Sequence, residues 1–287
     1  MRATTQLRQM LNSPGIILAP GAYDGISARL IERQGFKAVY MTGAGTAASV
    51  LGQPDIGLTT LTEMTTHAAH IASCVSLPVI ADADTGYGNA LNVIRTVREY
   101  ERAGVAAIHL EDQVFPKRCG HLAGKAVIPA KEFAEKIRAA SENRTDPDFI
   151  IIARTDARAV NGLDDAIARA RLYREAGADV IFVEAPTSSE EIERIAREVE
   201  APLLSNQVPG GRTPAVTASE LEKLGYKIVI FPAVGFMAAA LAIEKALSRL
   251  KETGTDWHEG PVLSPLEIFQ RVGIEAWLDM ERKYSKS

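Results

Sequence analysis

The chain has 287 residues, a formal net charge of −4 and 46% hydrophobic residues, which is ordinary for a globular protein and argues against a broad nucleic-acid or anionic-membrane surface. Its two cysteines do not make a disulfide framework and favour a reducing, cytoplasmic setting. The N-terminal residues lack the apolar run of a secretory signal, and the longest uncharged run, residues 228–243, is too short and too broken by Pro232 and Gly235 to span a membrane.

Eight short apolar segments rich in β-branched residues recur along the chain. Most are continuous apolar runs, which is the pattern of parallel strands that are covered on both faces. They are residues 16–19, 38–42, 78–82, 106–111, 149–154, 180–184, 202–206 and 228–231. Helical periodicity follows nearly every one, at residues 25–33, 61–74, 90–102, 163–175, 189–198, 218–223 and 237–251. The candidate helix caps are Gly35, Gly104, Gly177 and Gly225 at the C-termini and Thr60, Ser188 and Thr217 at the N-termini.

Eight β–α units without an obvious linker predict an α/β fold, a single (β/α)8 TIM-type barrel over residues 1–287. The alternative is an open doubly wound sheet. Such a sheet usually has fewer strands and a glycine-rich phosphate-binding turn after the first one, which residues 20–24 do not match.

Two segments exceed the minimal barrel. The connection at residues 112–129 is long and contains Gly120 and Gly124, so we expect a mobile lid there. Residues 252–287 form a C-terminal extension with an expected helix at residues 265–283, and its aromatic side chains predict that it docks. The eighth helix begins with residues that are apolar nearly all round, which indicates burial against another subunit.

Polar residues stand at the carboxyl ends of six successive predicted strands. Catalytic groups of a (β/α)8 barrel lie at this end of the strands. A random surface would not place its polar groups with this regularity, so we expect a functional rim. The residues are Tyr40 and Thr42 on the second strand, Asp82 and Asp84 on the third, His109 and Glu111 on the fourth, Arg154 on the fifth, Glu184 on the sixth and Asn206 on the seventh.

Asp82, Asp84 and Glu111 form an oxygen-rich cluster in this rim. Hard oxygen ligands suit Mg²⁺ or Mn²⁺, which keep several waters and accept the substrate as a further ligand. The alternative is that the two aspartates only cap the next helix. Gly86 and Gly88 favour the metal, because glycines let the backbone approach a ligand.

Three further features have both a functional and a structural interpretation. The glycines of residues 42–45 are either ordinary turns or a source of backbone N–H groups for a carboxylate. Arg154, if buried at a strand end, demands an acidic partner or a ligand. Cys119 lies between Lys117 and His121, whose charges would lower the pKa of its thiol or hold it beside an anion, unless it is only a small residue in a loop.

Two motifs carry a resemblance to a known group of enzymes. DADTGYG at residues 82–88 and, above all, KRCGH at residues 117–121 resemble the isocitrate lyase/phosphoenolpyruvate mutase superfamily. The resemblance extends from about residue 19 to about residue 239. KRCGH points to the branch of 2-methylisocitrate lyase, 2,3-dimethylmalate lyase and carboxyphosphonoenolpyruvate mutase, whose thiol-containing lid closes over the substrate.

The resemblance implies a (β/α)8 barrel whose eighth helix is swapped between subunits, and a homotetramer built as a dimer of such dimers. It implies a small anionic substrate, with no nucleic-acid or membrane partner, and Mg²⁺ as the cofactor, with Mn²⁺ as a possible substitute. The residues implied in metal binding are Asp82 and Asp84, partly through water, with Asp55, His109 and Glu111 nearby.

The resemblance also implies a Mg²⁺-dependent lyase that cleaves a carbon–carbon bond of a 2-hydroxy di- or tricarboxylate in a retro-aldol-type step. Tyr40 is the implied base and Cys119 the implied proton donor, with Lys117, His121 and Arg154 as further catalytic residues. The implied substrate-binding residues are Thr42, Gly43, Ala44, Asp82, Gly120 and Arg154, with Glu184 and Asn206 facing the other half of the substrate. A carboxyvinyl-carboxyphosphonate phosphorylmutase and an oxaloacetate decarboxylase remain the alternatives.

The sequence departs from 2-methylisocitrate lyases in the loop after the eighth strand. Those enzymes carry Pro-Leu-Ser-Ala-Phe-Arg where this chain has Pro-Ala-Val-Gly-Phe-Met at residues 232–237. They also carry a glutamate in the loop after Asn206, near Pro209 here. The loss of a hydroxyl and a charge favours a substrate less demanding than a tricarboxylate, such as an alkyl-substituted malate, although the lid sequence looks closest to carboxyphosphonoenolpyruvate mutase.

Overall fold

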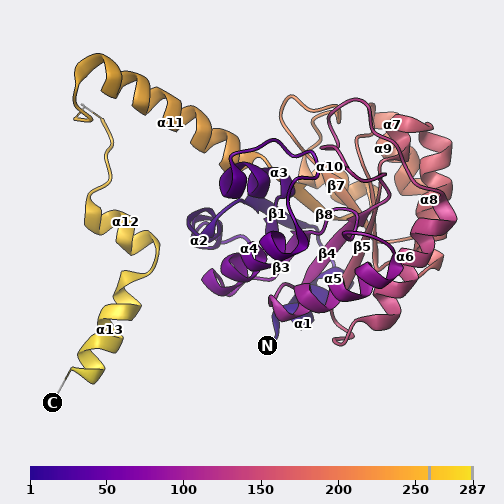
Figure 1. Cartoon of the computed structure of the whole chain (residues 1–287), viewed down its shortest axis with the longest axis horizontal. Helices are drawn as coiled ribbons and strands as arrows, with labels where there is room; N and C mark the ends of the chain where they lie inside the picture. Colours follow the sequence, from indigo (N-terminus) through magenta and orange to yellow (C-terminus); the bar gives the residue numbers. More distant parts are fainter. Residues whose placement is uncertain (258–259, 286–287) are drawn as a thin grey trace.

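A computed structural model of the protein describes residues 1–257 and 260–285. Eight parallel strands close into a barrel in sequence order, with the last strand paired to the first (Figure 1). The strands are β1 (Ile17–Ala22), β2 (Val39–Met41), β3 (Val79–Asp82), β4 (Ala107–Glu111), β5 (Ile150–Thr155), β6 (Val180–Val183), β7 (Leu203–Asn206) and β8 (Tyr226–Phe231). The predicted (β/α)8 fold is confirmed, and each predicted strand overlaps an observed one.

Helices surround the barrel as its outer layer (Figure 1). They include α2 (Gly25–Arg33), α4 (Leu61–Cys74), α5 (Ala90–Arg102), α6 (Ala130–Asn143), α8 (Leu163–Glu175), α9 (Ser189–Glu198) and α10 (Ala218–Leu224). The bounds predicted for α2, α4, α5, α8 and α9 are those observed. The side chains of Thr60, Ser188 and Thr217 each accept a hydrogen bond from the third helical N–H, so these predicted N-caps are confirmed.

Several short or terminal helices are absent from the sequence-based prediction. They are α1 (Ala3–Asn12), α3 (Gly43–Thr46), the π-helical turn η1 (Ala47–Leu51) and α7 (Ala157–Val160), and the longer α6 was not predicted either. Two glycines in four residues give α3 a low intrinsic helix propensity. The Thr42 side chain nevertheless accepts a hydrogen bond from Gly45 N and starts the helix.

The interior of the barrel and the layer between strands and helices are separate apolar clusters. Leu7 and Leu11 of α1 belong to the interior cluster and are buried, so α1 closes the amino-terminal end of the barrel. Tyr40 and Phe182 belong to the same interior cluster. The carboxyl-terminal end of the strands is therefore the end that remains available for a site.

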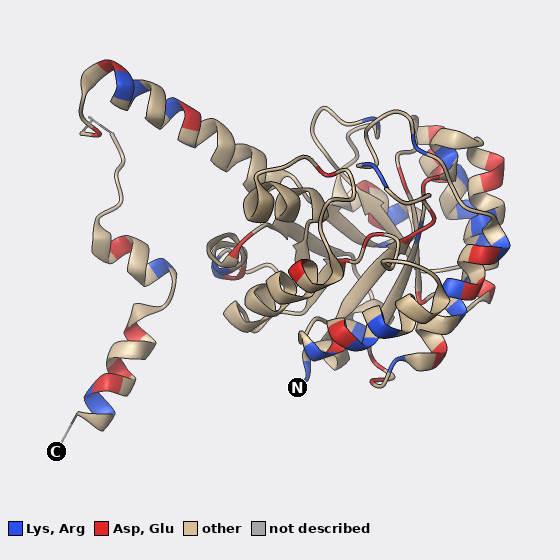
Figure 2. Ribbon diagram, viewed as in Figure 1, with Lys and Arg blue, Asp and Glu red and all other residues tan. Residues whose placement is uncertain are grey.

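The eighth helix, α11 (Val234–Thr253), leaves the barrel as a long arm, and none of its described residues is buried (Figure 1). Its first ten residues carry no charge, in contrast to the charged outer helices of the barrel (Figure 2). Within the described part of the chain, no helix is both long and apolar enough to cross a membrane.

After α11 the C-terminal extension turns and runs down beside the barrel, on the side of α2, to the C-terminus (Figure 1). The single helix expected at residues 265–283 is two helices, α12 (Pro265–Arg271) and α13 (Ile274–Tyr284), because Gly273 between them takes a left-handed backbone conformation with φ of 88°. Trp277 is 70% exposed, and no described residue of either helix is buried. The expected docking is therefore not seen within one copy of the chain, apart from a contact between α12 and α2.

Candidate active site

The predicted polar residues meet at the carboxyl-terminal end of the barrel. The parallel register places Asp82 beside His109 and Glu111 beside Arg154 on neighbouring strands. A cavity of about 240 Å³ opens there, between the strand ends and the lid. The predicted site residues that line it are Tyr40, Thr42, Gly43, Ala44, Asp55, Asp82, Cys119, Gly120, His121, Arg154, Glu184 and Asn206. The other four, Asp84, His109, Glu111 and Lys117, are buried around it.

Lys117 enters the carboxylate cluster from the lid. Its Nζ lies 2.5 Å from Asp55 Oδ1 and 2.7 Å from Asp84 Oδ1, and 2% of its side chain is exposed. Burial lowers the pKa of Lys117, but the carboxylates of Asp84, Glu111, Asp55 and Asp82 outweigh burial and raise that pKa well above its usual value. Lys117 is therefore a fixed positive charge inside the cluster.

Asp84 has an unusual backbone and an unusual acidity. Its φ is 46°, in the left-handed region that non-glycine residues rarely adopt and that is often found at functional sites. Burial raises the pKa of Asp84 to about 6, although Lys117 opposes the rise. Burial also raises the pKa of Asp82 and of Glu111. Lys117 contacts two of the four carboxyl groups, Asp55 and Asp84, and Arg154 lies beside Glu111.

The cluster fits a divalent cation that keeps part of its water shell. Glu111 Oε1 is buried without a hydrogen-bond partner, as an oxygen awaiting a ligand or an ordered water would be. Among the described residues, no three His, Cys, Asp or Glu side chains are grouped so that they could hold a metal ion by themselves. Mg²⁺ is usually bound through one or two carboxylates, several waters and the substrate, so an open set of oxygen donors suits it.

His109 and Tyr40 form a buried pair beside this cluster. The Tyr40 hydroxyl lies 2.8 Å from His109 Nε2, and the same nitrogen lies 3.5 Å from Asp82 Oδ1. Burial, with Arg154 and Lys117 nearby, lowers the pKa of His109 to about 3, so its imidazole is neutral. Burial and the Asp82 charge raise the pKa of Tyr40 well above its usual value. Nε2 of His109 is therefore hydrogen-bonded to Tyr40, and the His109 ring lies behind the cavity wall.

Arg154 is buried within a ring of carboxylates. Its Nε and Nη2 donate to Asp156 at 2.9 and 3.2 Å, and its Nε lies 3.3 Å from Glu111 Oε2. Its Nη2 lies 3.7 Å from Glu184 Oε2, and Asn206 Nδ2 donates to Glu184 Oε2 at 3.3 Å. The expectation that this arginine has acidic partners is confirmed, and its guanidinium is held rigidly at the cavity wall.

Helix α3 begins at the cavity, where the sequence predicted a turn or an anion-binding loop. Gly43 lies against the carboxylate cluster, because a Cβ there would lie 2.2 Å from Asp82 Oδ2. Glycine is required for this close approach of backbone and carboxylate. The backbone of residues 43–45 is thereby brought to the same wall as Asp82.

The lid at residues 112–129 covers the cavity. Its two arms pair at Gln113 and Val127, and Val114 N donates to Ala126 O at 2.8 Å. At its tip, Cys119 N donates to Asp55 O at 3.1 Å. Gly120 packs so closely that a Cβ there would lie 2.6 Å from Arg154 Nη2 and from Glu184 Oε1.

The pKa of Cys119 is raised in the structure, contrary to one of the two sequence-based expectations. Burial raises that pKa, and Lys117 points into the carboxylate cluster instead of toward the sulfur. Cys119 is a free cysteine, and its thiol keeps its proton at neutral pH. The His121 imidazole extends from the same turn to 3.7 Å from Glu184 Oε1.

Sequence reasoning missed two charged residues of this region. Lys125 of the lid donates to Asp156 Oδ1 at 2.6 Å, and Asp156 holds Arg154. Asp156 follows Arg154 and Thr155 directly, so its proximity could have been inferred from the strand end. Nothing in the sequence around Lys125 indicates a role, because its contact with Asp156 joins residues that are 31 positions apart.

The remaining wall of the cavity is apolar. It is formed by Val208 and Pro209 after β7 and by Ala233, Phe236 and Met237 at the start of α11. Arg154 is the sole lysine or arginine among the described residues that line the cavity. One end of the cavity can therefore bind an anion strongly, and the other end suits hydrocarbon.

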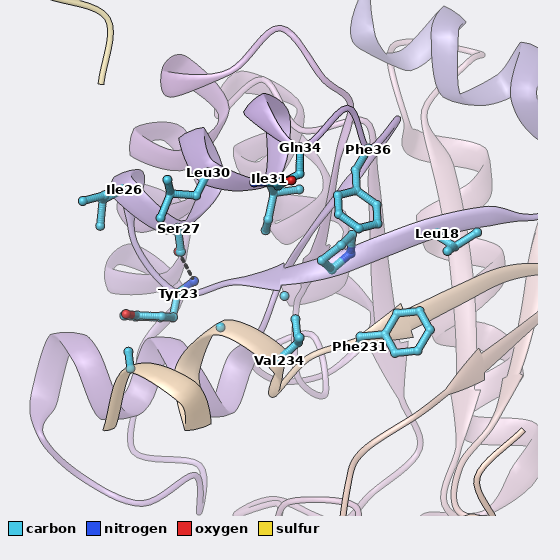
Figure 3. A pocket seen from close by; sticks show the side chains of 14 residues that line it. Leu18, Tyr23, Ile26, Ser27, Leu30, Ile31, Gln34, Phe36, Phe231 and Val234 are labelled. Atoms are coloured by element: carbon cyan, nitrogen blue, oxygen red, sulfur yellow. Dashed lines mark hydrogen bonds between the residues drawn. The ribbon is translucent and has the colours of Figure 1, made fainter. Parts of the chain in front are cut away.

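A second, larger cavity of about 510 Å³ lies outside the barrel between α2, β1 and the first turn of α11. Figure 3 shows that Ile26, Leu30, Phe36, Phe231 and Val234 surround it. No Lys, Arg, Asp or Glu lines it within the described residues. It has the character of a packing surface and offers no group for acid–base or metal chemistry.

Comparison with known proteins gives a consistent family of relatives. The model of the phosphoenolpyruvate phosphomutase family matches residues 7–251. A 2,3-dimethylmalate lyase from Eubacterium barkeri is 46% identical over 99% of each chain. A 2-methylisocitrate lyase from Aeropyrum pernix is 51% identical over 87% of this chain and 80% of its own. The chloroplastic carboxyvinyl-carboxyphosphonate phosphorylmutase of Arabidopsis thaliana is 42% identical over 99% of this chain and 85% of its own.

Solved structures agree with these relatives. A crystal structure of 2,3-dimethylmalate lyase superposes with a TM-score of 0.95 at 43% identity, covering 99% of this chain and 96% of that one. Oxaloacetate acetylhydrolase with bound 3,3-difluorooxalacetate also gives 0.95, at 40% identity over 99% and 98% of the two chains. Phosphonopyruvate hydrolase in complex with oxalate and Mg²⁺ gives 0.90, at 33% identity over the whole of both chains.

Proposed function

Because the chain belongs to the phosphoenolpyruvate phosphomutase family, within the isocitrate lyase/phosphoenolpyruvate mutase superfamily, we propose that it is a Mg²⁺-dependent carbon–carbon lyase. Its substrate would be a 2-hydroxy dicarboxylate that is cleaved to a 2-oxo acid and a second carboxylate. The observation that carries this proposal is the position of Cys119, whose protonated thiol lines the same cavity as Arg154 and Asp82. The identity with 2,3-dimethylmalate lyase over nearly the whole chain supports it.

In this proposal, one end of the cavity binds the portion of the substrate that becomes the 2-oxo acid. The Arg154 guanidinium would pair with the carboxylate, and the backbone of Thr42, Gly43 and Ala44 would border it. Asp156 and Glu111 hold the guanidinium from behind and fix its direction before the substrate arrives. A group held in this way does not reorganise during the reaction.

Asp82 and Asp84 would hold Mg²⁺, with Asp55 and Glu111 as further oxygen donors around it. When bound, the cation would polarise the substrate oxygens and make the 2-hydroxyl more acidic. Lys117 would help to balance the four carboxylates from the lid side. The Mg²⁺ in the related phosphonopyruvate hydrolase supports this assignment.

Two residues of this chain would handle the protons. Tyr40 is the candidate to take the proton of the substrate hydroxyl while its own proton passes, in the same step, to Nε2 of the neutral His109 imidazole 2.8 Å away. As the carbon–carbon bond breaks, its electrons remain on the carbon next to the second carboxylate. The Cys119 thiol would give its proton to that carbon, and the closed lid would exclude water until it has done so.

The apolar wall indicates the second half of the substrate. A tricarboxylate would place its third carboxylate near Ala233, Phe236 or Met237, where the described lining offers no lysine or arginine. A methyl group is compatible with that wall. We therefore favour 2,3-dimethylmalate, whose cleavage gives pyruvate and propanoate, over 2-methylisocitrate.

Two other reactions of the same family remain candidates. The structural likeness to oxaloacetate acetylhydrolase favours a carbon–carbon cleavage of oxaloacetate. The 42% identity with a carboxyvinyl-carboxyphosphonate phosphorylmutase favours phosphorus–carbon chemistry. Both need the same anion-binding end of the cavity, so the distal wall and the lid would decide between them.

The exposed arm and the outer cavity support an assembly of several copies. The outer cavity lies where the eighth helix of a barrel would pack, while α11 of the same chain points away (Figure 1). We propose that α11 of a second copy fills it, in a helix-swapped dimer that pairs into a homotetramer. A cytoplasmic location, where the two free cysteines stay reduced, completes the proposal.

A substrate panel tests the lyase proposal. We expect 2-oxo acid release from 2,3-dimethylmalate with Mg²⁺, and kcat/KM at least about tenfold lower for 2-methylisocitrate, because a buried unpaired carboxylate costs more than 1.4 kcal/mol. EDTA should abolish the activity and excess Mg²⁺ should restore it. Oxaloacetate and phosphonopyruvate belong in the same panel. Turnover of either one without turnover of the substituted malates would replace the proposal with the corresponding alternative.

A further inference from the structure

A single lysine joins the lid tip to the arginine at the cavity wall. Lys125 Nζ donates to Gly120 O at 2.5 Å and to Asp156 Oδ1 at 2.6 Å. Gly120 follows Cys119 in the turn that lines the cavity. Asp156 holds Arg154 by two hydrogen bonds. The contacts therefore run without interruption from the turn that carries the thiol to the anion-binding guanidinium.

We propose that Lys125 is a positioning residue for the lyase reaction: it latches the closed lid to Asp156 and so places Cys119 only when Arg154 is correctly oriented. The inference rests on the proposed function for the identity of the reaction, and on the observed contacts for the latch. Lys125 does not line the cavity, so it would act through Gly120 and Asp156 and not by touching the substrate.

Lys125 and Asp156 are both buried when the lid is closed, so the closed lid requires that these two charges pair. The Lys125 side chain is 2% exposed and that of Asp156 is 0% exposed. A lysine that leaves water without a charge partner pays a large desolvation cost, which a well-placed carboxylate offsets. Asp156 takes that place while it is fixed by Arg154. When the lid opens, Lys125 would be hydrated and Asp156 would stay paired with Arg154. Neither charge would then be buried without a partner.

The base of the lid is held by groups other than Lys125, so the proposed latch is not needed for the lid to fold. Asp112 O accepts from Ile128 N at 2.9 Å, so the two ends of the lid are tied together directly. The Asp112 carboxylate accepts from Thr155 Oγ1 at 2.7 Å and from Tyr173 OH at 2.8 Å. Arg169 Nη1 donates to Ile128 O at 2.9 Å. A variant without the Lys125 ammonium should therefore fold and keep the lid attached.

The experiment compares Lys125→Met with Lys125→Arg in the full-length protein. The readout is the rate at which iodoacetamide alkylates Cys119, measured by peptide mass mapping with Cys74 as the internal reference, with and without Mg²⁺ and oxalate. Oxalate is the ligand seen in the related phosphonopyruvate hydrolase. Lys131→Met, which removes an exposed lysine just beyond the lid, is the matched control.

In the wild type, Mg²⁺ and oxalate should slow the alkylation of Cys119 by about tenfold or more, because the ligand shifts the population toward the closed lid. In Lys125→Met this protection should fall below about twofold, and kcat on the lyase substrate should fall about 10²-fold with KM changed little, as for a misplaced catalytic group. Lys125→Arg should recover most of both effects, and Lys131→Met should behave as wild type.

Full protection in Lys125→Met would overturn the latch, and so would a wild type whose Cys119 reacts equally fast with and without oxalate. A failure of Lys125→Arg to recover the protection would reduce Lys125 to a packing role. The protection assay requires no turnover. If it behaves as expected while the substrate panel shows no lyase activity, the latch stands and the proposed reaction falls.

Discussion

Cys119 lies half-buried on the lid and lines the same cavity as Arg154. Lys117, one of the cations that flank it in the sequence, is paired with Asp55 and Asp84 instead. Burial keeps the thiol protonated, so at the scale of the single residue the structure favours a proton donor over a nucleophile.

The proton-donor role predicts the behaviour of Cys119→Ser. A serine hydroxyl is a far weaker acid than a thiol, so kcat should fall by about 10²- to 10⁴-fold, the usual contribution of general acid catalysis. Calorimetry with Mg²⁺ and oxalate should show binding within a few-fold of wild type, because Arg154 and the carboxylates are untouched. Cys74→Ser is the control and should retain full turnover. Near-normal turnover of Cys119→Ser would exclude the role.

The positions of the rim residues could be predicted from the sequence because the carboxyl ends of parallel strands lie at the same end of the barrel. Asp82, Glu111 and Arg154 each end an apolar run, and parallel pairing then brings them together. The contacts of Lys125 and the protonation state of Cys119 could not be predicted from the sequence. They depend on how a loop folds back over the barrel, which no local pattern encodes.

At the scale of elements, several helices with a capping side chain, such as α4, were predicted to the residue, whereas α1 and α6, which have no capping side chain, were missed. The capping box of Thr60 and Glu63 marks the start of α4 in the sequence. Helix α1 has no capping side chain and is stabilised by packing Leu7 and Leu11 into the barrel. Tertiary burial, which is invisible in the local sequence, decides such elements.

The lid is the element on which turnover should depend most sharply. A Cβ at Gly120 would lie 2.6 Å from both Arg154 Nη2 and Glu184 Oε1, and both side chains are buried, so Gly120→Ala should prevent full closure. We expect kcat to fall about 10²-fold while thermal stability stays close to wild type. Kinetics and thermal unfolding measure this. Ala123→Ser, in the exposed part of the lid, should be neutral, and a Gly120→Ala enzyme of normal kcat would show that the lid need not close this far.

At the scale of the whole molecule, the chain exposes more apolar surface than a stable monomer needs. Leu241 is 69% and Leu247 is 57% exposed on α11, and an apolar cavity of about 510 Å³ stands open beside α2 (Figure 3). The barrel itself could be predicted from the order of strands and helices. The apolar start of the eighth helix indicated burial against another subunit, but its residues alone do not give the direction in which α11 leaves the barrel, because an apolar helix can also pack on its own barrel.

The proposed assembly predicts the effect of charges on α11. Leu241→Glu with Leu247→Glu should convert the oligomer to monomers in sedimentation velocity experiments, since two carboxylates would enter an apolar interface. Activity should fall with it, because Phe236 and Met237 in the first turn of the same helix line the active-site cavity and lose their support. Lys245→Glu, which places a glutamate where the helix is already charged, should leave the oligomer intact. A double variant that sediments like wild type would remove α11 from the interface and leave the outer cavity without its proposed occupant.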